Sequence, residues 1–210
     1  MESDTPHIDF FSELADAPRP CYQHILENDT SRLEDQSAIG SSASDGVSTG
    51  SSVGTAVGGG TRRWICDCAQ PSSTELAAGL FSCGPGCINR AINIECSPRC
   101  PAGEGCSNRA FKQRWYAPSR PFYAGPDKGW GLKALDLISK GSFIIEYVGE
   151  MIDFNEFRRR VRHYERLGRV HHYFMAVSPD RFIDAGSKGN WARFVNHSCE
   201  PNSETQKVIF

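Results

Sequence analysis

The chain has 210 residues, of which 39% are hydrophobic, and a formal net charge of −2 at pH 7. This length allows one substantial domain and a second, small one, but the hydrophobic content is low for a chain that folds along its whole length. No stretch approaches the ~20 apolar residues that a transmembrane helix needs, and the N-terminus has neither the basic nor the apolar region of a secretory signal. We therefore expect neither a membrane protein nor a secreted one.

Charge divides the chain into an acidic segment and a basic body. Residues 1–60 contain two Lys/Arg and ten Asp/Glu, whereas residues 61–210 contain 21 and 15. Residues 39–60 are almost wholly Ser, Gly, Ala, Thr and Val, a composition that buries too little apolar surface to offset the entropy of ordering. The sequence predicts a disordered segment over 1–60, with at most a short helix at 30–36. A basic body favours a polyanionic partner, although an excess of this size is more common on an ordinary solvated surface.

Seven cysteines lie close together between residues 62 and 110, in a region with little helix or strand periodicity. They are Cys66, Cys68, Cys83, Cys87, Cys96, Cys100 and Cys106. In a reducing compartment, cysteines at such spacings indicate structural zinc rather than disulfides. Zinc bound only by thiolates takes four ligands, so seven cysteines cannot form two separate sites. Either one thiolate bridges two zinc ions, or an outside ligand completes the second site, or a single zinc leaves three thiols free. The tight clustering favours two ions.

Beyond the cysteines, the pattern becomes that of a domain with short strands and one clear helix. Residues 129–135 predict a Gly-rich turn that leads into a strand. The apolar run 143–152 predicts a buried strand with a bulge at Gly149. Residues 173–177 and 181–184 predict two short strands around a Pro-Asp turn.

A helix is predicted to begin at Asp153, which can cap it, and to end at Gly168. Glu156 stands three residues after the cap, as in a capping box. Apolar residues recur at spacings of three and four, at Phe154, Phe157, Val161, Tyr164 and Leu167. The opposite face carries Arg158, Arg159, Arg162 and Arg166. This basic face could contact nucleic acid, but a solvated face is the more common arrangement.

Residues 193–202, Arg-Phe-Val-Asn-His-Ser-Cys-Glu-Pro-Asn, place an amide, an imidazole, a hydroxyl and a thiol in four consecutive positions. The Pro-Asn pair at the end forces a turn. The apolar pair Phe194-Val195 indicates partial burial, so the polar groups need partners. On residue types alone, a satisfied structural turn with a core cysteine explains this segment about as well as a functional site does.

With these motifs, the chain resembles the SET-domain protein-lysine methyltransferases, and above all the branch that modifies the lysine-36 site of histone H3. The likeness rests on Lys-Gly-Trp-Gly at 128–131, Glu-Tyr-Val-Gly-Glu at 146–150, Tyr-Phe-Met-Ala at 173–176, and residues 193–202. The cysteine block resembles the zinc module called AWS (associated with SET). The resemblance implies an AWS-type module at 61–113 and a SET domain at 114–210. The expected fold is thus mostly β, of the SET type, behind a small zinc-cluster module and a disordered N-terminus.

The resemblance also implies the ligands of each site. Cys83 would bridge two zinc ions. One ion would be held by Cys66, Cys68, Cys83 and Cys87, and the other by Cys83, Cys96, Cys100 and Cys106. Cys199 would belong to a third zinc, completed by three cysteines after the SET domain. S-adenosylmethionine would be bound by Lys128, Gly129, Trp130, His171, His172, Tyr173, Asn196 and His197. Tyr147 and Tyr173 would be the catalytic tyrosines, with Tyr147 lining the lysine channel.

The implied reaction transfers a methyl group from S-adenosylmethionine to a lysine amine of histone H3. The amine must be neutral, although free lysine has a pKa of about 10.4. A narrow apolar channel and the neighbouring sulfonium charge would disfavour the ammonium form, so no metal or strong base is needed. The implied partners are the H3 tail and nucleosomal DNA, and the implied location is the chromosome in the nucleus. The rival hypothesis is a non-catalytic, zinc-organised chromatin-binding protein.

The sequence departs from the family pattern in three respects. The family continues with a Phe-Asp-Tyr motif and a cysteine tail, whereas this chain stops at Phe210. His172 and Val208 stand where the branch usually has Tyr and Trp. We therefore expect an incomplete SET domain from a truncated chain, with weak or no activity.

Overall fold

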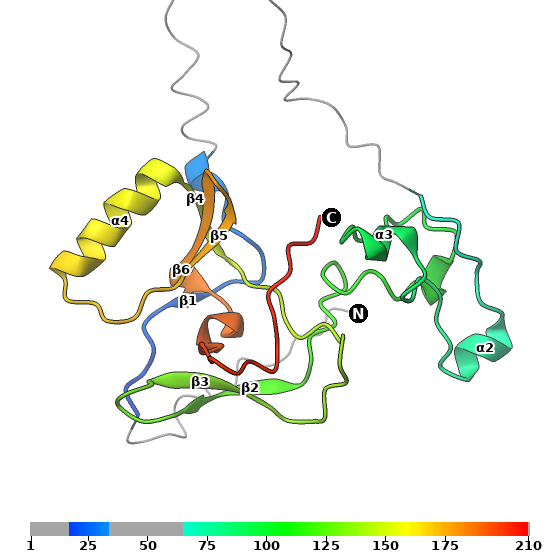
Figure 1. Cartoon of the computed structure of the whole chain (residues 1–210), viewed down its shortest axis with the longest axis horizontal. Helices are drawn as coiled ribbons and strands as arrows, with labels where there is room; N and C mark the ends of the chain where they lie inside the picture. The colour runs from blue at the N-terminus through cyan, green and yellow to red at the C-terminus, as the bar shows by residue number, and fades with distance from the viewer. Residues whose placement is uncertain (1–16, 34–64, 210) are drawn as a thin grey trace, which may run out of the picture. The chain divides into compact units, whose positions relative to one another are not determined.

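The computed structural model describes residues 17–33 and 65–209. Strands outnumber helices, as expected for a mostly β fold. In chain order the elements are β1 (Gln23–His24), α2 (Ser73–Ala77), α3 (Ile88–Ala91), the 3-10 helix η2 (Gly103–Gly105), β2 (Ser119–Tyr123), β3 (Trp130–Ala134), β4 (Gly149–Asp153), α4 (Phe154–Arg166), β5 (Phe174–Ser178), β6 (Arg181–Gly189) and the 3-10 helix η3 (Trp191–Phe194) (Figure 1). Within the described residues, no helix is long and apolar enough to cross a membrane.

The chain forms two compact units, each built from several segments. Of the described residues, the sheet unit contains 17–33, 119–135 and 147–196. The cysteine unit contains the described residues 65–118, 136–146 and 197–209. In the sheet unit, β6 is the central strand, pairing antiparallel with β4 and β5 and parallel with β1. Strands β2 and β3 form a separate antiparallel pair. The two strands predicted around the Pro-Asp turn are confirmed as β5 and β6.

Strand β4 begins at an irregularity in its pairing with β6, between Gly149 and Glu150. A Cβ atom at Gly149 would lie only 2.6 Å from the carbonyl oxygen of Asp184, so any side chain there would collide with the neighbouring strand. The predicted bulge is confirmed, because the strands can approach this closely only at a glycine.

The strand predicted over 143–152 is wrong in its first half. Residues 143–146 belong to the cysteine unit, where the Phe143 ring lies 4.5 Å from the Phe111 ring. The carbonyl oxygen of Ile144 accepts a hydrogen bond from Ala117 N at 2.8 Å. One apolar run therefore serves the cores of two units, and its hydrophobicity alone could not indicate where the strand starts.

Helix α4 begins and ends where the sequence predicted. The Asp153 carboxylate accepts a hydrogen bond from Glu156 N at 2.8 Å, and Gly168 ends the helix with φ +63°. The carboxylate of Glu156 binds the side chains of Arg159 and Arg160, in place of the reciprocal bond of a capping box. On the apolar face, the Phe157 ring stacks on the Phe182 ring of β6, with centroids 4.2 Å apart.

A buried ion-pair cluster fixes α4 to the sheet. Arg160 is only 5% exposed, and its guanidinium lies 2.9 Å from Glu150 and 2.6 Å from Asp184. Tyr164 donates a further hydrogen bond to Asp184 at 2.9 Å. Hydrogen bonds from Arg159 and, with a smaller effect, from Arg160 lower the pKa of Glu156 to about 2. Arg32 also lies 3.4 Å from Glu150, so three arginines face the three carboxylates of the cluster.

Residues 17–33 form an ordered part of the sheet unit, whereas the sequence predicted disorder over all of 1–60. They supply β1, and the backbone of Asp29 hydrogen-bonds with Gly149 O and Met151 N of β4. Residues 31–33 form a helical turn inside the short helix predicted at 30–36. The linker predicted at 39–60 lies outside the described residues.

We predict that Arg160→Ala lowers the free energy of unfolding by about 3–5 kcal/mol, because it leaves buried carboxylates without their partner. Arg159→Ala removes an exposed arginine from the same helix and should cost less than ~1 kcal/mol. Urea denaturation of the protein, followed by far-UV circular dichroism, measures both changes. Equal losses in the two variants would contradict the assigned role of the cluster.

Candidate active site and metal centre

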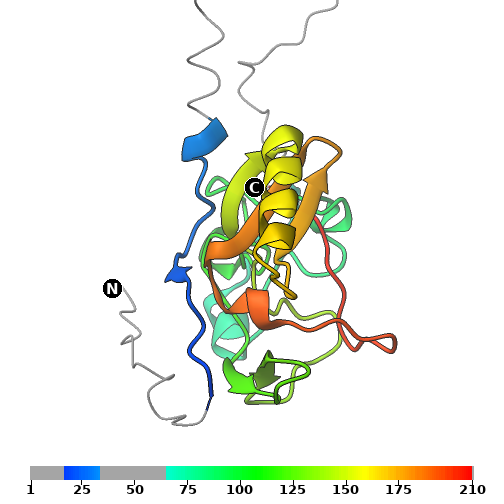
Figure 2. The same cartoon turned by 90° about the vertical axis from the view of Figure 1, so that its left-hand side faces the viewer.

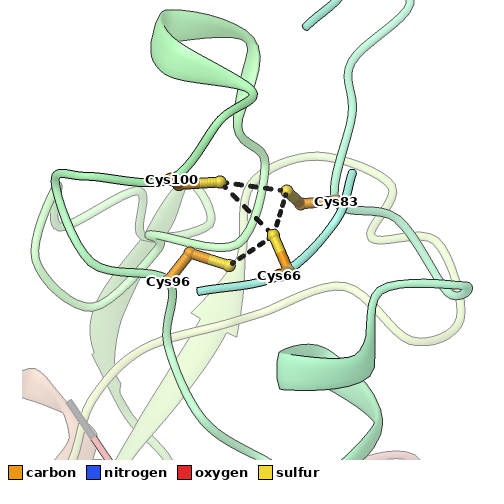
Figure 3. A group of neighbouring side chains, drawn as sticks. All are labelled: Cys66, Cys83, Cys96 and Cys100. Carbon is orange, nitrogen blue, oxygen red and sulfur yellow. Dashed lines mark hydrogen bonds between the residues drawn. The ribbon is translucent and has the colours of Figure 1, made fainter. Parts of the chain in front are cut away.

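The sulfur atoms of four cysteines in the cysteine unit, Cys66, Cys83, Cys96 and Cys100, point toward a common centre (Figure 3). Cys66 Sγ lies 3.7 Å from Cys83 Sγ, 3.5 Å from Cys100 Sγ and 4.0 Å from Cys96 Sγ. Four thiolates placed tetrahedrally at about 2.3 Å from one zinc ion would lie roughly 3.8 Å apart. The separations of these sulfur atoms therefore fit the spacing that a zinc ion imposes.

Two groups of four thiols could each hold a metal ion, and they share Cys66 and Cys83. One group is Cys66, Cys68, Cys83 and Cys87, which equals the first ligand set implied by the family resemblance. The other group is Cys66, Cys83, Cys96 and Cys100. The resemblance places Cys106 in the second set in place of Cys66. Cys106 is buried in the same cluster, and its role as a zinc ligand stays a prediction.

Polar side chains around the cluster turn hydrogen-bond donors toward sulfur and toward the cysteine backbone. The Nδ2 atoms of Asn89 and Asn108 lie 3.5 Å and 3.3 Å from Cys96 Sγ. Arg90 Nε donates to the carbonyl oxygen of Cys83 at 2.8 Å. Cys83 has φ +58°, a left-handed conformation that is uncommon for residues other than glycine. Donors to sulfur favour the thiolate, and a strained backbone is often kept at a functional position.

Burial makes some of these thiols hard to ionise in the absence of a metal. It raises the pKa of Cys68 to about 11 and that of Cys100 to about 12. Such thiols are protonated at neutral pH, whereas thiols that bind zinc must be deprotonated. Binding of zinc would therefore release protons, and the ion would provide the stability that an aliphatic core provides elsewhere.

In the sheet unit, the two tyrosines predicted to be catalytic lie together. The hydroxyl of Tyr147 donates a hydrogen bond to the backbone carbonyl of Tyr173 at 2.8 Å. Burial raises the pKa of the Tyr147 phenol above its usual range. The guanidinium of Arg193 lies 3.9 Å from the centre of the Tyr173 ring. Tyr147 is therefore a neutral, oriented phenol, and its pKa excludes it as a base at neutral pH.

Four of the residues predicted to bind the cofactor also lie together. Asn196 Nδ2 donates to the carbonyl oxygen of Trp130 at 3.2 Å. Gly129 has φ +65°, and a Cβ atom built on it would lie 3.6 Å from His171 Nε2. The side chains of Asn196 and His171 are exposed, so their polar groups are accessible to a ligand. Backbone, amide and imidazole groups of this kind suit the amino-acid and adenine ends of S-adenosylmethionine.

The other predicted residues occupy different surroundings. Lys128 is exposed at the turn before β3. The ring of His172 lies nearly parallel to that of Phe174, with centroids 6.4 Å apart. His197 and Cys199 fall in the cysteine unit, where His197 Nε2 lies 3.9 Å from Cys199 Sγ and both side chains are exposed. The third zinc site predicted at Cys199 is not formed by the described residues.

Comparison with known protein families gives two matches. The SET domain model matches residues 129–209, and the AWS domain model matches residues 81–114. The chain carries an AWS domain followed by a SET domain. The SET match lies inside the range 114–210 expected for that domain, and the AWS match ends one residue beyond the expected range 61–113, so the domain boundaries stay a prediction. Cys66 and Cys68 precede the matched AWS range, although the structure places them in the same thiol cluster.

Several curated proteins are similar to this chain over about two thirds of its length. Human histone-lysine N-methyltransferase SETD2 is 47% identical over 146 residues, which are 70% of this chain and 6% of that protein. Histone-lysine N-methyltransferase Set2 of Drosophila melanogaster is 50% identical over 142 residues, with 68% and 6% covered. The human protein named "Histone-lysine N-methyltransferase, H3 lysine-36 specific" is 48% identical over 143 residues, with 68% and 5% covered. The chain thus spans only about one-twentieth of the length of these relatives.

A solved structure of the Chaetomium thermophilum polycomb repressive complex 2 is also similar to part of the chain. The TM-score is 0.49 at 26% sequence identity, over 54% of this chain and 17% of that chain.

Sequence reasoning did not single out two residues beside the SET-domain tyrosines. Arg193 is buried, and its guanidinium also lies 4.4 Å from the centre of the Tyr22 ring. Arg193 stands in a segment recognised from the sequence, but nothing in that segment indicates that the arginine is buried. Tyr22 lies in the acidic segment, and its neighbours in sequence give no periodic signal of a strand.

We predict that zinc protects the AWS-domain thiols from chemical modification. Cys21 and Cys199 are exposed, so these two thiols should react rapidly with Ellman's reagent while the buried cysteines react slowly. Addition of a strong zinc chelator should expose all nine thiols to rapid reaction, because the metal holds the cluster together. Rapid reaction of all nine thiols before chelation, or an unchanged number of rapidly reacting thiols after it, would contradict a metal-held cluster.

Proposed function

We propose that this chain contains the methyl-transferring part of an S-adenosylmethionine-dependent histone-lysine N-methyltransferase that acts on lysine 36 of histone H3. The observation that carries the proposal is the pairing of Tyr147 with Tyr173 in the unit that also brings Gly129, Trp130 and Asn196 together. Support also comes from the SET domain match and from relatives whose names include histone-lysine N-methyltransferase.

S-adenosylmethionine would supply the methyl group from its sulfonium sulfur. The residues that would hold it are the backbone at Gly129 and Trp130, together with the Asn196 amide and the His171 imidazole. The left-handed turn at Gly129 (φ +65°) leaves space beside the backbone that a side chain would occupy. The amide of Asn196 is already oriented by its bond to Trp130 O, so its carbonyl oxygen remains available to accept a hydrogen bond.

Tyr147 and Tyr173 would act on the lysine. Their half-buried rings remove water from the amine, and this desolvation favours the neutral form that can attack a methyl group. The fixed Tyr147 hydroxyl would orient the amine without taking its proton, because the raised pKa keeps the phenol protonated. Alignment of the amine, rather than general-base catalysis, would then supply most of the rate enhancement.

We further propose that the protein works on chromatin in the nucleus, with the histone H3 tail and nucleosomal DNA as partners. Arg158, Arg162 and Arg166 of α4 are exposed and form a basic face. Contacts from such a face to DNA phosphates would weaken as the salt concentration rises.

We predict that Asn196→Ala lowers methyl transfer on the order of tenfold or more, since it removes a hydrogen-bonding group from the cofactor site. Asn155→Ala is the matched control, because Asn155 is an exposed asparagine on α4, away from Trp130 and Tyr147. Transfer is measured with tritiated S-adenosylmethionine and recombinant nucleosomes, with the protein in excess so that one slow turnover is detectable.

Nucleosomes in which lysine 36 of H3 is replaced by arginine decide the target. Label that persists on them would refute lysine 36 but not methyl transfer. No transfer and no S-adenosylmethionine binding by calorimetry, together with salt-sensitive nucleosome binding, would support the non-catalytic chromatin-binding protein instead.

We also propose that the AWS domain holds two zinc ions, with Cys83 as a shared ligand. Elemental analysis by mass spectrometry should then give two zinc ions per chain, because seven thiolates with one bridge satisfy two four-coordinate sites. Cys83→Ser should lose both ions, whereas Cys21→Ser, at an exposed cysteine outside the cluster, should retain them. One zinc in the parent chain, or two in Cys83→Ser, would contradict the bridged arrangement.

A further inference from the structure

Residues 17–33 form a strap along the sheet unit, and in Figure 2 this blue segment runs beside the sheet as an extended chain. At one end, Pro18 O accepts a hydrogen bond from the indole of Trp130 at 2.9 Å. In the middle, β1 pairs with the end of β6, and Ile25 N donates to Gly189 O at 2.8 Å. At the other end, Asn28 Oδ1 accepts from Gly149 N at 3.0 Å. The strap therefore touches β3, β6 and β4 in turn.

Between the first two contacts, the strap places Tyr22 against a buried cation. The Arg193 guanidinium lies between two tyrosine rings, 4.4 Å from the centre of the Tyr22 ring and 3.9 Å from that of Tyr173. Arg193 Nε donates to Ala185 O at 2.8 Å. In the described part of the chain, no carboxylate lies within ion-pair distance of this guanidinium. The two ring faces therefore stabilise a charge that has lost much of its hydration, which is the setting in which cation–π contacts are strongest.

The arrangement connects Tyr22 to the residues proposed to line the lysine channel. Arg193 packs on the ring of Tyr173, and the carbonyl oxygen of Tyr173 accepts hydrogen bonds from Tyr147 Oη at 2.8 Å and from Ala185 N at 3.0 Å. A shift of Arg193 would therefore move the Tyr173 ring and, through the backbone, the hydroxyl of Tyr147. Among the described residues, the Tyr22 ring contacts the rings of His24 and Phe194 and the guanidinium of Arg193, and Arg193 also packs on the ring of Tyr173, so the influence of Tyr22 on Tyr173 passes through Arg193.

We propose that Tyr22 is a positioning residue for the lysine end of the site, and that the strap is a working part of the methyltransferase unit. The proposal rests on the proposed function for its link to catalysis. The aromatic ring of Tyr22, rather than its hydroxyl, supports Arg193. The ring stack formed by Tyr22, Arg193 and Tyr173 then keeps Tyr147 oriented.

The test compares Tyr22→Leu, which keeps apolar volume but removes the ring face, with Tyr22→Phe, which keeps the ring. Single-turnover methyl transfer should fall ~2- to 30-fold in Tyr22→Leu and stay within about twofold of the parent in Tyr22→Phe. The dissociation constant for S-adenosylmethionine should change by less than about twofold in both, because the ring stack acts on the lysine end. Cys21→Ala, at the exposed neighbouring position, is the matched control.

Hydrogen exchange followed by mass spectrometry provides a readout that does not need activity. In Tyr22→Leu, exchange should increase in residues 173–178 and 185–195 and remain unchanged in α4 and in residues 81–114. If the parent chain transfers no methyl group, the proposed function fails, and this exchange pattern alone decides whether Tyr22 positions Tyr173. The proposal is overturned by parent-like exchange in Tyr22→Leu, by an equal loss in Tyr22→Phe, or by increased exchange throughout α4.

Discussion

The sheet unit depends on one buried contact, the ion pair between Arg160 of α4 and Asp184 of β6. Asp184 has no exposed surface, and it accepts hydrogen bonds from Arg160, from Tyr164 and from the backbone of Gly186. The two residues after Asp184 offer their carbonyl oxygens to Arg193. The strand that anchors the helix on one side therefore also places the arginine beside the site tyrosines. Because both functions use consecutive residues of β6, the helix and the site cannot shift independently.

The cysteine unit reaches stability by a different physical route. Among the described residues, its buried cluster consists of six cysteines and one small aliphatic residue, Ala102, with no larger apolar side chain. Thiols packed at these separations bury little apolar surface, so the hydrophobic effect alone gives the unit little stability. A metal ion bound by several thiolates can supply the difference, and it also fixes the loops in one arrangement. One chain thus combines a unit held by burial and ion pairs with a unit whose side chains suit a metal.

The local features of the fold could be predicted from the sequence. Each of these features depends on a residue type with a known local preference. They are the Asp153 cap, the Gly168 stop, the Gly149 bulge and the clustering of seven cysteines. The failures have a common cause, which is tertiary context. Arg160 lies on the inward face of α4, three residues after Phe157 and four before Tyr164, but only the positions of Glu150 and Asp184 explain why an arginine is buried there. Tyr22 lies in an acidic segment of low hydrophobicity, and its order comes from pairing with β6, which no local pattern reveals. The structure brings together two groups of four thiols. The full set of zinc ligands that the family resemblance implies, which includes Cys106, stays a prediction.

The pairing of β1 with the last strand of the sheet has a consequence for biosynthesis. Asp29 of the strap and its ion-pair partner Lys188 are 159 residues apart in the chain. At a translation rate of about 5–20 residues per second, the ribosome needs roughly 8–30 s to make the partner after the strap has been made. During that interval β6, the strand with which β1 pairs, is incomplete, and the tyrosine and isoleucine of the strap are available to chaperones or to wrong partners. A segment that leaves the ribosome before the rest of the sheet is therefore among the last parts of the sheet unit to reach its native contacts.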